Sequence, residues 1–211
     1  MKHATQTNGE CQNSYAQEEL LHAAIQNYED DNMEAAISQF LTLAERGCEE
    51  AFLYLSLIYR DGDGAEKDEL QAARYKKRYV QSIETKAAEG ISAYQLKLAY
   101  MLQFGDGVAI DNARAFRLFS ELASAGGGEA QFHLSRIYAH GWCGQKANPE
   151  LELYWLDEAT KSEWPKAIYY SALFLEAEPS SAESISRIKE MMHRAAELGC
   201  WQAKEYLEKS K

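Results

Sequence analysis

The chain has few cysteines, prolines and basic residues, and each shortage argues against a class of protein. Its 211 residues include 4 Cys and 3 Pro, and its 22 Lys and Arg are outnumbered by 33 Asp and Glu. The cysteines are scattered and form no Cys-x-x-Cys or Cys/His cluster, so neither a metal site nor a disulfide framework is indicated. The net charge of -11 argues against nucleic acid as a partner, because its binders cluster Lys and Arg.

Long apolar segments are also missing. The first ten residues lack the apolar core of a secretory signal, and no window of about 18 apolar residues predicts a membrane-spanning helix. Together with the unpaired cysteines, this predicts a cytoplasmic protein with no membrane partner. A composition of 46% hydrophobic and 26% charged residues is typical of a folded domain, here with an acidic surface.

Two nearly identical glycine motifs mark an internal repeat. Residues 62–64 read Gly-Asp-Gly and are followed by Asp68, while residues 105–107 repeat Gly-Asp-Gly and are followed at the same offset by Asp111. A looser third copy occupies residues 141–148. The spacing of about 40 residues lies within the range of helical repeat units.

Each glycine motif follows a segment with helical periodicity. Residues 51–59 and 130–138 place Ala, Leu, Ser and Tyr at the same offsets, so their apolar residues line one face of a helix. We therefore predict that the glycines end one helix in the left-handed conformation and that Asp68, Asp111 and Asn148 cap the next helix.

The stretch Asp-Gly-Asp-Gly at residues 61–64 could also begin a calcium loop. An EF-hand requires oxygen ligands at positions 1, 3 and 5, Gly at position 6 and Glu at position 12. Here positions 5 and 6 are Ala65 and Glu66, so the formula fails. A phosphate-binding loop fails as well, because no strand precedes the glycines and no Lys-Ser/Thr follows them.

The repeated positions resemble the Sel-like repeat (SLR) family, relatives of the tetratricopeptide repeats, at Ala44, Gly47, Ala51, Leu55, Tyr59, Gly62 and Gly64. The resemblance covers residues 32–211 and implies an all-α, right-handed superhelical solenoid of about four helix-pair repeats. The second unit carries about two extra helical turns, and the fourth lacks its Gly-x-Gly. Residues 15–31 are expected to form an N-terminal capping helix, and residues 1–14 to be disordered.

The resemblance also implies a function, a non-enzymatic protein-protein interaction module. Such an adaptor or regulator would bind a peptide or protein in a concave groove and need no cofactor. In this family the first helix of each pair lines the groove. Its outward positions give six candidate residues: Ser38, Arg114, Arg117, Tyr154, Arg187 and Glu190.

A single basic cluster, Arg-Tyr-Lys-Lys-Arg-Tyr, occupies residues 74–79. One interpretation is a solvated helix face paired with neighbouring carboxylates. The other is a contact with an acidic partner through Arg74, Tyr75, Lys77 and Arg78. In the second case, charge reversal of the three cations is expected to weaken partner binding and leave the thermal midpoint nearly unchanged.

The remaining candidate residues have structural interpretations. Cys48 and Cys200 follow glycines between helices, where we expect them to fill space, although a helix N-terminus could lower the pKa of their thiols. Trp155 falls in a core register, whereas Trp142 and Tyr154 are less constrained and are expected to be exposed.

Two alternative functions stay open. One is a hydrolase or a protein that processes cell-wall-like ligands, but Sel-like proteins of that kind carry paired repeat cysteines, which are missing here. The other, an immunity-type inhibitor or a secretion-type chaperone, is compatible by fold analogy alone. The oligomeric state is left open by the sequence.

Overall fold

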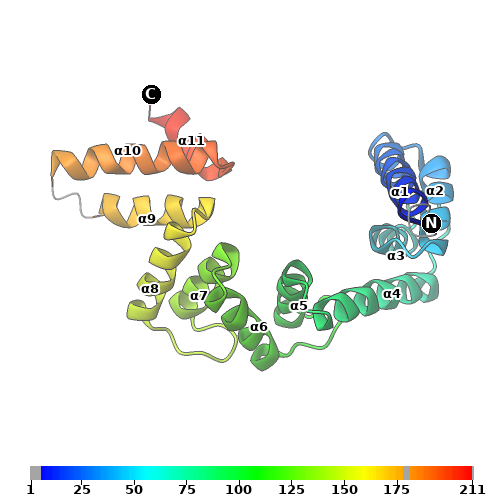
Figure 1. Cartoon of the computed structure of the whole chain (residues 1–211), viewed down its shortest axis with the longest axis horizontal. Helices are drawn as coiled ribbons and strands as arrows, with labels where there is room; N and C mark the ends of the chain where they lie inside the picture. Colours follow the sequence, from blue (N-terminus) through cyan, green and yellow to red (C-terminus); the bar gives the residue numbers. More distant parts are fainter. Residues whose placement is uncertain (1–5, 178–180, 211) are drawn as a thin grey trace. The chain divides into compact units, whose positions relative to one another are not determined.

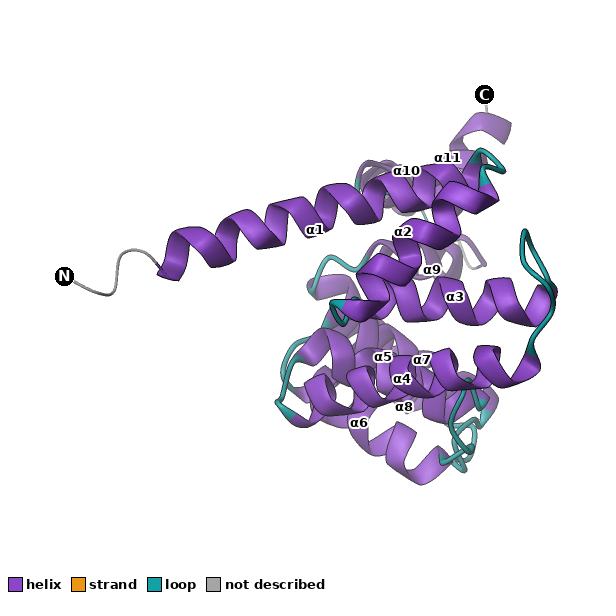
Figure 2. Cartoon of the chain, turned by 90° about the vertical axis from the view of Figure 1, so that its right-hand side faces the viewer, coloured by secondary structure: helices purple, strands orange, loops and turns teal. Residues whose placement is uncertain are grey.

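The computed structural model describes residues 6–177 and 181–210, and there it consists of α-helices joined by turns and loops (Figure 1). A long helix, α1 (Gln6–Glu29), comes first (Figure 2). It is followed by the first helices of five pairs, α2 (Met33–Glu45), α4 (Glu69–Ala88), α6 (Asn112–Ser124), α8 (Pro149–Lys161) and α10 (Ala182–Glu197). Their second helices are α3 (Glu49–Asp61), α5 (Ser92–Phe104), α7 (Gly128–His140), α9 (Pro165–Ala177) and α11 (Trp201–Lys209). The predicted all-α class and helix-pair repeat are confirmed.

The lengths of the helices follow the repeat. Helices α2, α3, α5, α6, α7, α8 and α9 each contain 13 residues. Helix α4 contains 20 residues, which corresponds to the two extra turns predicted for the second unit. Helix α11 has 9 residues.

The N-terminal helix is longer than the capping helix expected from the sequence. It was predicted over residues 15–31 but begins at Gln6, so residues 6–14, expected to be disordered, have a helical backbone. Residues 6–14 contain no proline, and adding residues to an existing helix is far easier than starting one. The rest of the expected disordered segment, residues 1–5, lies outside the described residues.

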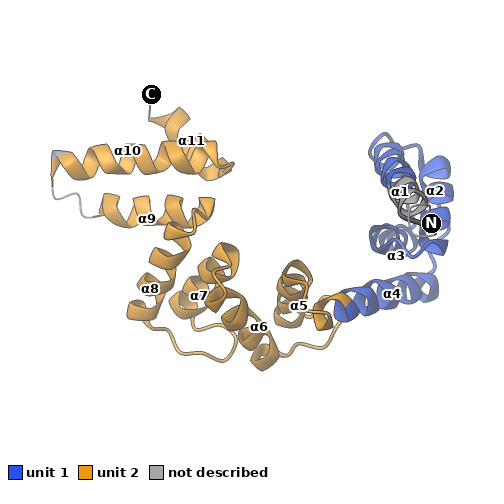
Figure 3. Ribbon diagram, in the orientation of Figure 1, with its two compact units in different colours: residues 1–85 blue, residues 86–211 orange. Residues whose placement is uncertain are grey.

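The chain divides into two compact units, residues 1–85 and residues 86–211 (Figure 3). In the first unit, the core is built from small and large residues of α2 and α3, and Phe40, Leu55 and Ile58 are fully buried. Helix α1 joins this core through Tyr28, whose ring lies 5.2 Å from that of Tyr54 in an edge-on contact. The Tyr54 ring in turn stacks at 4.6 Å on Phe40. An aromatic cluster therefore connects the first three helices.

In the second unit, successive helices bury the same register positions. Phe119 of α6 and Leu134 and Ile137 of α7 are buried, as are Ile188 and Met192 of α10. The prediction that Trp155 lies in the core is wrong. The core residue is its neighbour Leu156, and Trp155 itself is only partly buried. One residue turns a helix by about 100°, so a shift of one position moves a side chain off the core face.

The loops between pairs confirm the helix-capping interpretation of the glycine motifs. Gly62, Gly105 and Gly141 are left-handed at the ends of α3, α5 and α7, with φ angles of 83°, 75° and 70°. Each amide donates to the carbonyl four residues earlier, for example Gly62 N to Ile58 O at 2.8 Å. A residue with a side chain would be strained at these positions.

The predicted N-caps are also confirmed. Asp68 Oδ1 accepts from Gln71 N at 2.9 Å, and Asp111 Oδ1 accepts from Arg114 N at 2.9 Å. Asn148 Oδ1 accepts from two amides at the start of α8, at 3.0 and 3.1 Å. These bonds satisfy donors that the first turn of a helix leaves unpaired.

The short turns between the two helices of each pair all contain a residue with positive φ, and in all but one of them this residue is glycine. Four of them place a glycine at positive φ, namely Gly47, Gly90, Gly126 and Gly199. In the turn between α8 and α9 the corresponding residue is Glu163, with φ of 55°. This strained position lies beside the candidate site.

Candidate peptide-binding groove

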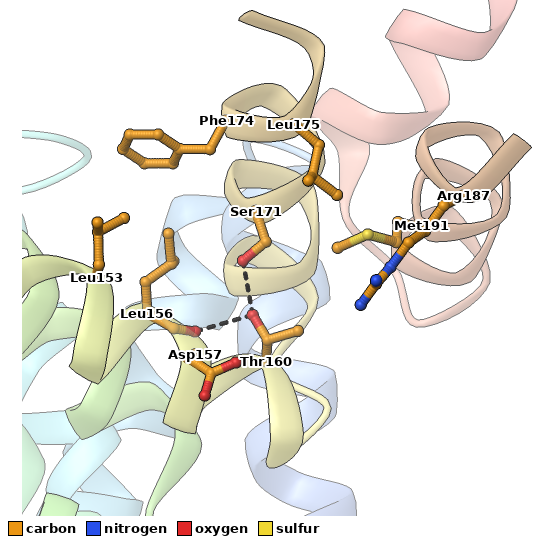
Figure 4. Close-up of a pocket in the computed structure, with 9 residues that line it drawn as sticks. All are labelled: Leu153, Leu156, Asp157, Thr160, Ser171, Phe174, Leu175, Arg187 and Met191. Atoms are coloured by element: carbon orange, nitrogen blue, oxygen red, sulfur yellow. Dashed lines mark hydrogen bonds between the residues drawn. The ribbon is translucent and has the colours of Figure 1, made fainter. Parts of the chain in front are cut away.

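A cavity of about 370 Å³ opens between α8, α9 and α10 (Figure 4). Three consecutive helices of the second unit contribute side chains to it. Within each helix the lining residues are mostly three or four positions apart, so they lie on one face. The lining residues are Leu153, Leu156, Asp157, Thr160, Ser171, Phe174, Leu175, Arg187 and Met191. The cavity is thus mainly apolar, with one carboxylate and one guanidinium among its lining groups.

Two hydroxyl groups join α8 and α9 at this cavity. Thr160 Oγ1 donates to the carbonyl of Leu156 at 2.8 Å and lies 2.8 Å from Ser171 Oγ (Figure 4). Because the hydroxyls bond to each other and to the backbone, they need no partner from solvent. The two helices are therefore fixed at the place where the cavity opens.

Two large apolar side chains at the cavity are exposed. Leu153 of α8 is 50% exposed and Phe174 of α9 is 47% exposed. Met191 of α10 is partly buried and extends from the opposite side in Figure 4. An apolar group placed between them would be in contact with three helices, and burial of the exposed surface would favour binding.

A second cavity, of about 310 Å³, adjoins the first along α10. Thr160, Arg187 and Met191 line both cavities, so the two form one groove. At the far side, Glu163 Oε1 accepts from Arg194 Nη2 at 2.5 Å and from Arg194 Nε at 3.2 Å. This ion pair links the turn between α8 and α9 to α10.

The structure brings two of the six predicted groove residues together. Arg187 and Glu190 line the groove on α10, and Tyr154 is 53% exposed on α8, beside Leu153. The others do not line these cavities: Arg114 and Arg117 belong to α6, and Ser38 lies on α2, in the other unit.

The apolar lining of the groove was not predicted from the sequence. Leu153 and Phe174 occupy helix positions outside the core stripe, and large apolar residues at such positions are the signal that could have identified them.

The basic cluster on α4 divides into two kinds of residue. Arg74, Tyr75 and Arg78 line a cavity of about 230 Å³ together with Gln71, whereas Lys77 is not part of its lining. Arg78 Nη2 donates to the carbonyl of Ala44 at 3.1 Å, so this cation also takes part in packing. Reversing its charge is therefore expected to lower stability, contrary to the sequence-based expectation.

The Cys48 thiol is a buried packing group. Burial raises the pKa of the Cys48 thiol, so the suggested activation by a helix N-terminus is wrong there. In the described part of the chain, no group of three or more His, Cys, Asp or Glu is placed to hold a metal ion. Nor does any described helix combine the length and apolar character needed to cross a membrane.

The repeat can now be compared with known families. The family model of the Sel1 repeat matches residues 50–75, 92–127 and 128–162. The chain carries Sel1 repeats. The predicted resemblance is thereby confirmed, and the matched segments run from α3 into α4 and then over α5–α6 and α7–α8.

Solved structures share the fold. A Sel1 repeat protein from Oxalobacter formigenes aligns over 90% of this chain and 74% of its own, with a TM-score of 0.53 and 19% identity. Pseudomonas aeruginosa 5086 aligns over 89% of this chain and 68% of its own, with a TM-score of 0.51 and 17% identity. At these identities the likeness establishes the solenoid fold alone.

Two similar proteins are named as regulators. The exopolysaccharide production negative regulator of Rhizobium leguminosarum bv. viciae is 25% identical over 189 residues, which are 86% of this chain and 70% of the relative. Chitin synthase regulatory factor 3 of Schizosaccharomyces pombe is 33% identical over 87 residues, which are 41% of this chain and 9% of the relative. Sel1 repeats are typically non-catalytic scaffolds, and both names fit such a role.

Proposed function

We propose that this Sel1 repeat protein is a non-enzymatic regulatory module that binds a peptide or protein segment in the groove between α8, α9 and α10. The observation that carries the proposal is the exposure of Leu153 and Phe174 beside a cavity of about 370 Å³. Apolar side chains that converge from neighbouring helices and remain open to solvent are typical of binding surfaces.

The chemistry of the groove defines the partner segment. An apolar side chain in the cavity would contact Leu153, Phe174 and Met191, and burying it would contribute about 1.5–3 kcal/mol. An acidic group next to this anchor would be placed to pair with Arg187, which lies along both cavities. Three such contacts contribute at most about 9 kcal/mol, and ordering the peptide reduces this sum, so we expect affinities weaker than about micromolar.

The regulatory role is supported by the comparisons, because both similar proteins are named as regulators. Repeat solenoids offer extended surfaces on which such control by binding is commonly built. In this role the protein would act by holding or blocking a partner.

The test is a peptide-library selection on the full chain, followed by titration calorimetry of the enriched peptides. We expect peptides with a large apolar residue next to Asp or Glu. Their affinity should fall at least ten-fold for the Phe174→Ser variant, which removes one wall of the cavity.

The matched control is Phe104→Ser. Phe104 is 65% exposed at the end of α5 and does not line the groove, so its loss should leave affinity unchanged. Equal binding to wild type and the Phe174→Ser variant would rule out the groove as the binding site, and so would equal loss with both variants.

A further inference from the structure

The cavity on helix α4 differs from the groove in chemical character. Gln71, Arg74, Tyr75 and Arg78 line it, and their spacing of three and four residues places them on one face of α4. Its volume is about 230 Å³, and its lining of two guanidinium groups, an amide and a phenol suits a polar group. Two guanidinium groups one helical turn apart form its cationic part.

One of these guanidinium groups is held in place by the rest of the first unit. Arg78 Nη2 donates to the carbonyl of Ala44 at 3.1 Å, and its central carbon lies 4.2 Å from the centre of the Phe52 ring. A guanidinium carries five N–H donors, so one bond to Ala44 leaves others for a ligand. Because the side chain is already ordered, a ligand would lose less conformational entropy on binding.

Tyr75 adds a rigid neighbour to the two cations. Its ring stacks against Tyr59 at 5.9 Å with an interplanar angle of 5°. Burial raises the pKa of the Tyr75 hydroxyl, the positive charges of Arg78 and Arg74 oppose that shift, and the charge of Glu45 adds to it. The Tyr75 hydroxyl therefore stays neutral and can offer a hydrogen bond beside the two guanidinium groups.

The positive face stands out in this chain, whose net charge is -11. A general attraction for anions is excluded by that charge, so anion binding would depend on local geometry. Arginine suits this task, since its planar fork matches the two oxygens of a carboxylate or phosphate.

We propose that the α4 face formed by Gln71, Arg74, Tyr75 and Arg78 is a binding site for a single oxyanion of a peptide partner. Arg78 supplies a preoriented fork, Arg74 a second positive charge, and Gln71 and Tyr75 neutral polar contacts. The oxyanion is the carboxylate of an acidic residue or the phosphate of a phosphorylated one. The site is separate from the groove at α8–α10 and does not depend on the proposed function of that groove.

The test uses three short acetylated peptides with the same flanking Gly and Ser residues and a central Glu, phosphoserine or Gln. Each is titrated at low salt into the full-length protein labelled with ¹⁵N, and the Arg Nε–Hε signals are followed by NMR. We expect the Arg74 and Arg78 signals to shift with the two anionic peptides and to stay unchanged with the Gln peptide. The tighter of the two anionic peptides identifies the source of the oxyanion.

Substitutions separate this site from general charge attraction. Arg74→Ala is expected to weaken binding of the anionic peptides about ten-fold. Lys77→Ala removes an equal charge from the same helix, outside the cavity lining, and should change affinity less than two-fold. Arg78→Lys keeps the charge but not the fork, and we expect a weakening of about five-fold or more. Circular dichroism shows whether each variant remains folded.

Two results would overturn the proposal. The first is binding of the Gln peptide as tightly as the anionic peptides. The second is an equal loss of affinity in Arg74→Ala and Lys77→Ala, which would mean that only the overall positive charge of α4 matters.

Discussion

Arg78 of α4 lies over the ring of Phe52 of α3, with its guanidinium carbon 4.2 Å from the ring centre. The same guanidinium donates to the carbonyl of Ala44 at the end of α2, at 3.1 Å. A single side chain therefore joins three helices of the first unit through its flat face and one of its edges.

Replacing Arg78 by Ala should destabilise the first unit by about 1–2 kcal/mol, because both contacts are lost. The adjacent Lys77→Ala change, at an exposed position, should cost less than about 0.5 kcal/mol. Urea unfolding followed by circular dichroism measures both. Equal stabilities of the two variants would show that the Phe52 and Ala44 contacts contribute nothing measurable.

Alanine substitutions at two glycines of the first unit distinguish the cost of backbone strain from the cost of a steric clash. Gly47 has φ of 81° and open space where a Cβ would lie, so Gly47→Ala should cost about 1 kcal/mol from the left-handed conformation alone. At Gly64, with φ of 69°, an added Cβ would lie 2.2 Å from Met33 Cβ. Gly64→Ala should therefore cost at least twice as much, as measured by thermal denaturation. A smaller effect at Gly64 would contradict the tight contact with Met33.

His133 is expected to make stability depend on pH. It is buried beside Phe119, Tyr100 and Trp142, it shares a 2.7 Å hydrogen bond with Gln103, and burial lowers its pKa to about 4. The unfolded chain therefore binds a proton between about pH 6.5 and 4 that the folded chain does not. Stability should fall as pH is lowered through this range, by up to about 1.4 kcal/mol per unit, and should not change on this account above pH 7.

The control for this prediction is His133→Gln. This side chain cannot titrate and keeps an amide that can bond to Gln103, so the slope between pH 6.5 and 4 should become shallower. Urea titrations at several pH values provide the measurement. An unchanged slope would assign the acid sensitivity to other groups.

The Asp-Gly-Asp-Gly loop after α3 should respond to loss of its cap and not to calcium. Asp68→Ala removes the bond to Gln71 N and should destabilise the protein by about 1 kcal/mol. Millimolar calcium should leave the thermal midpoint of the wild-type protein unchanged, because Asp68 serves as a helix cap. A calcium-dependent rise that Asp68→Ala abolishes would contradict this assignment.

The turns could be predicted from the sequence because their chemistry is local. Gly62 and Asp68 act on backbone atoms within a few residues, and their copies repeat the same pattern, so spacing alone located both ends of the helices. The groove depends on three helices brought together by packing. Nothing near Phe174 in the sequence shows that α8 and α10 approach it, and the inward contact of Arg78 with Phe52 is likewise a tertiary feature.

The turn between α8 and α9 has a consequence for the groove. Where four equivalent turns use glycine, Glu163 takes a strained backbone conformation and extends its carboxylate to Arg194 on α10. One wall of the groove is thereby tethered by an exposed ion pair, and such pairs weaken as salt is added. Added salt should therefore make the α10 side of the groove less firmly held. The affinity of even an uncharged peptide should then depend on the salt concentration.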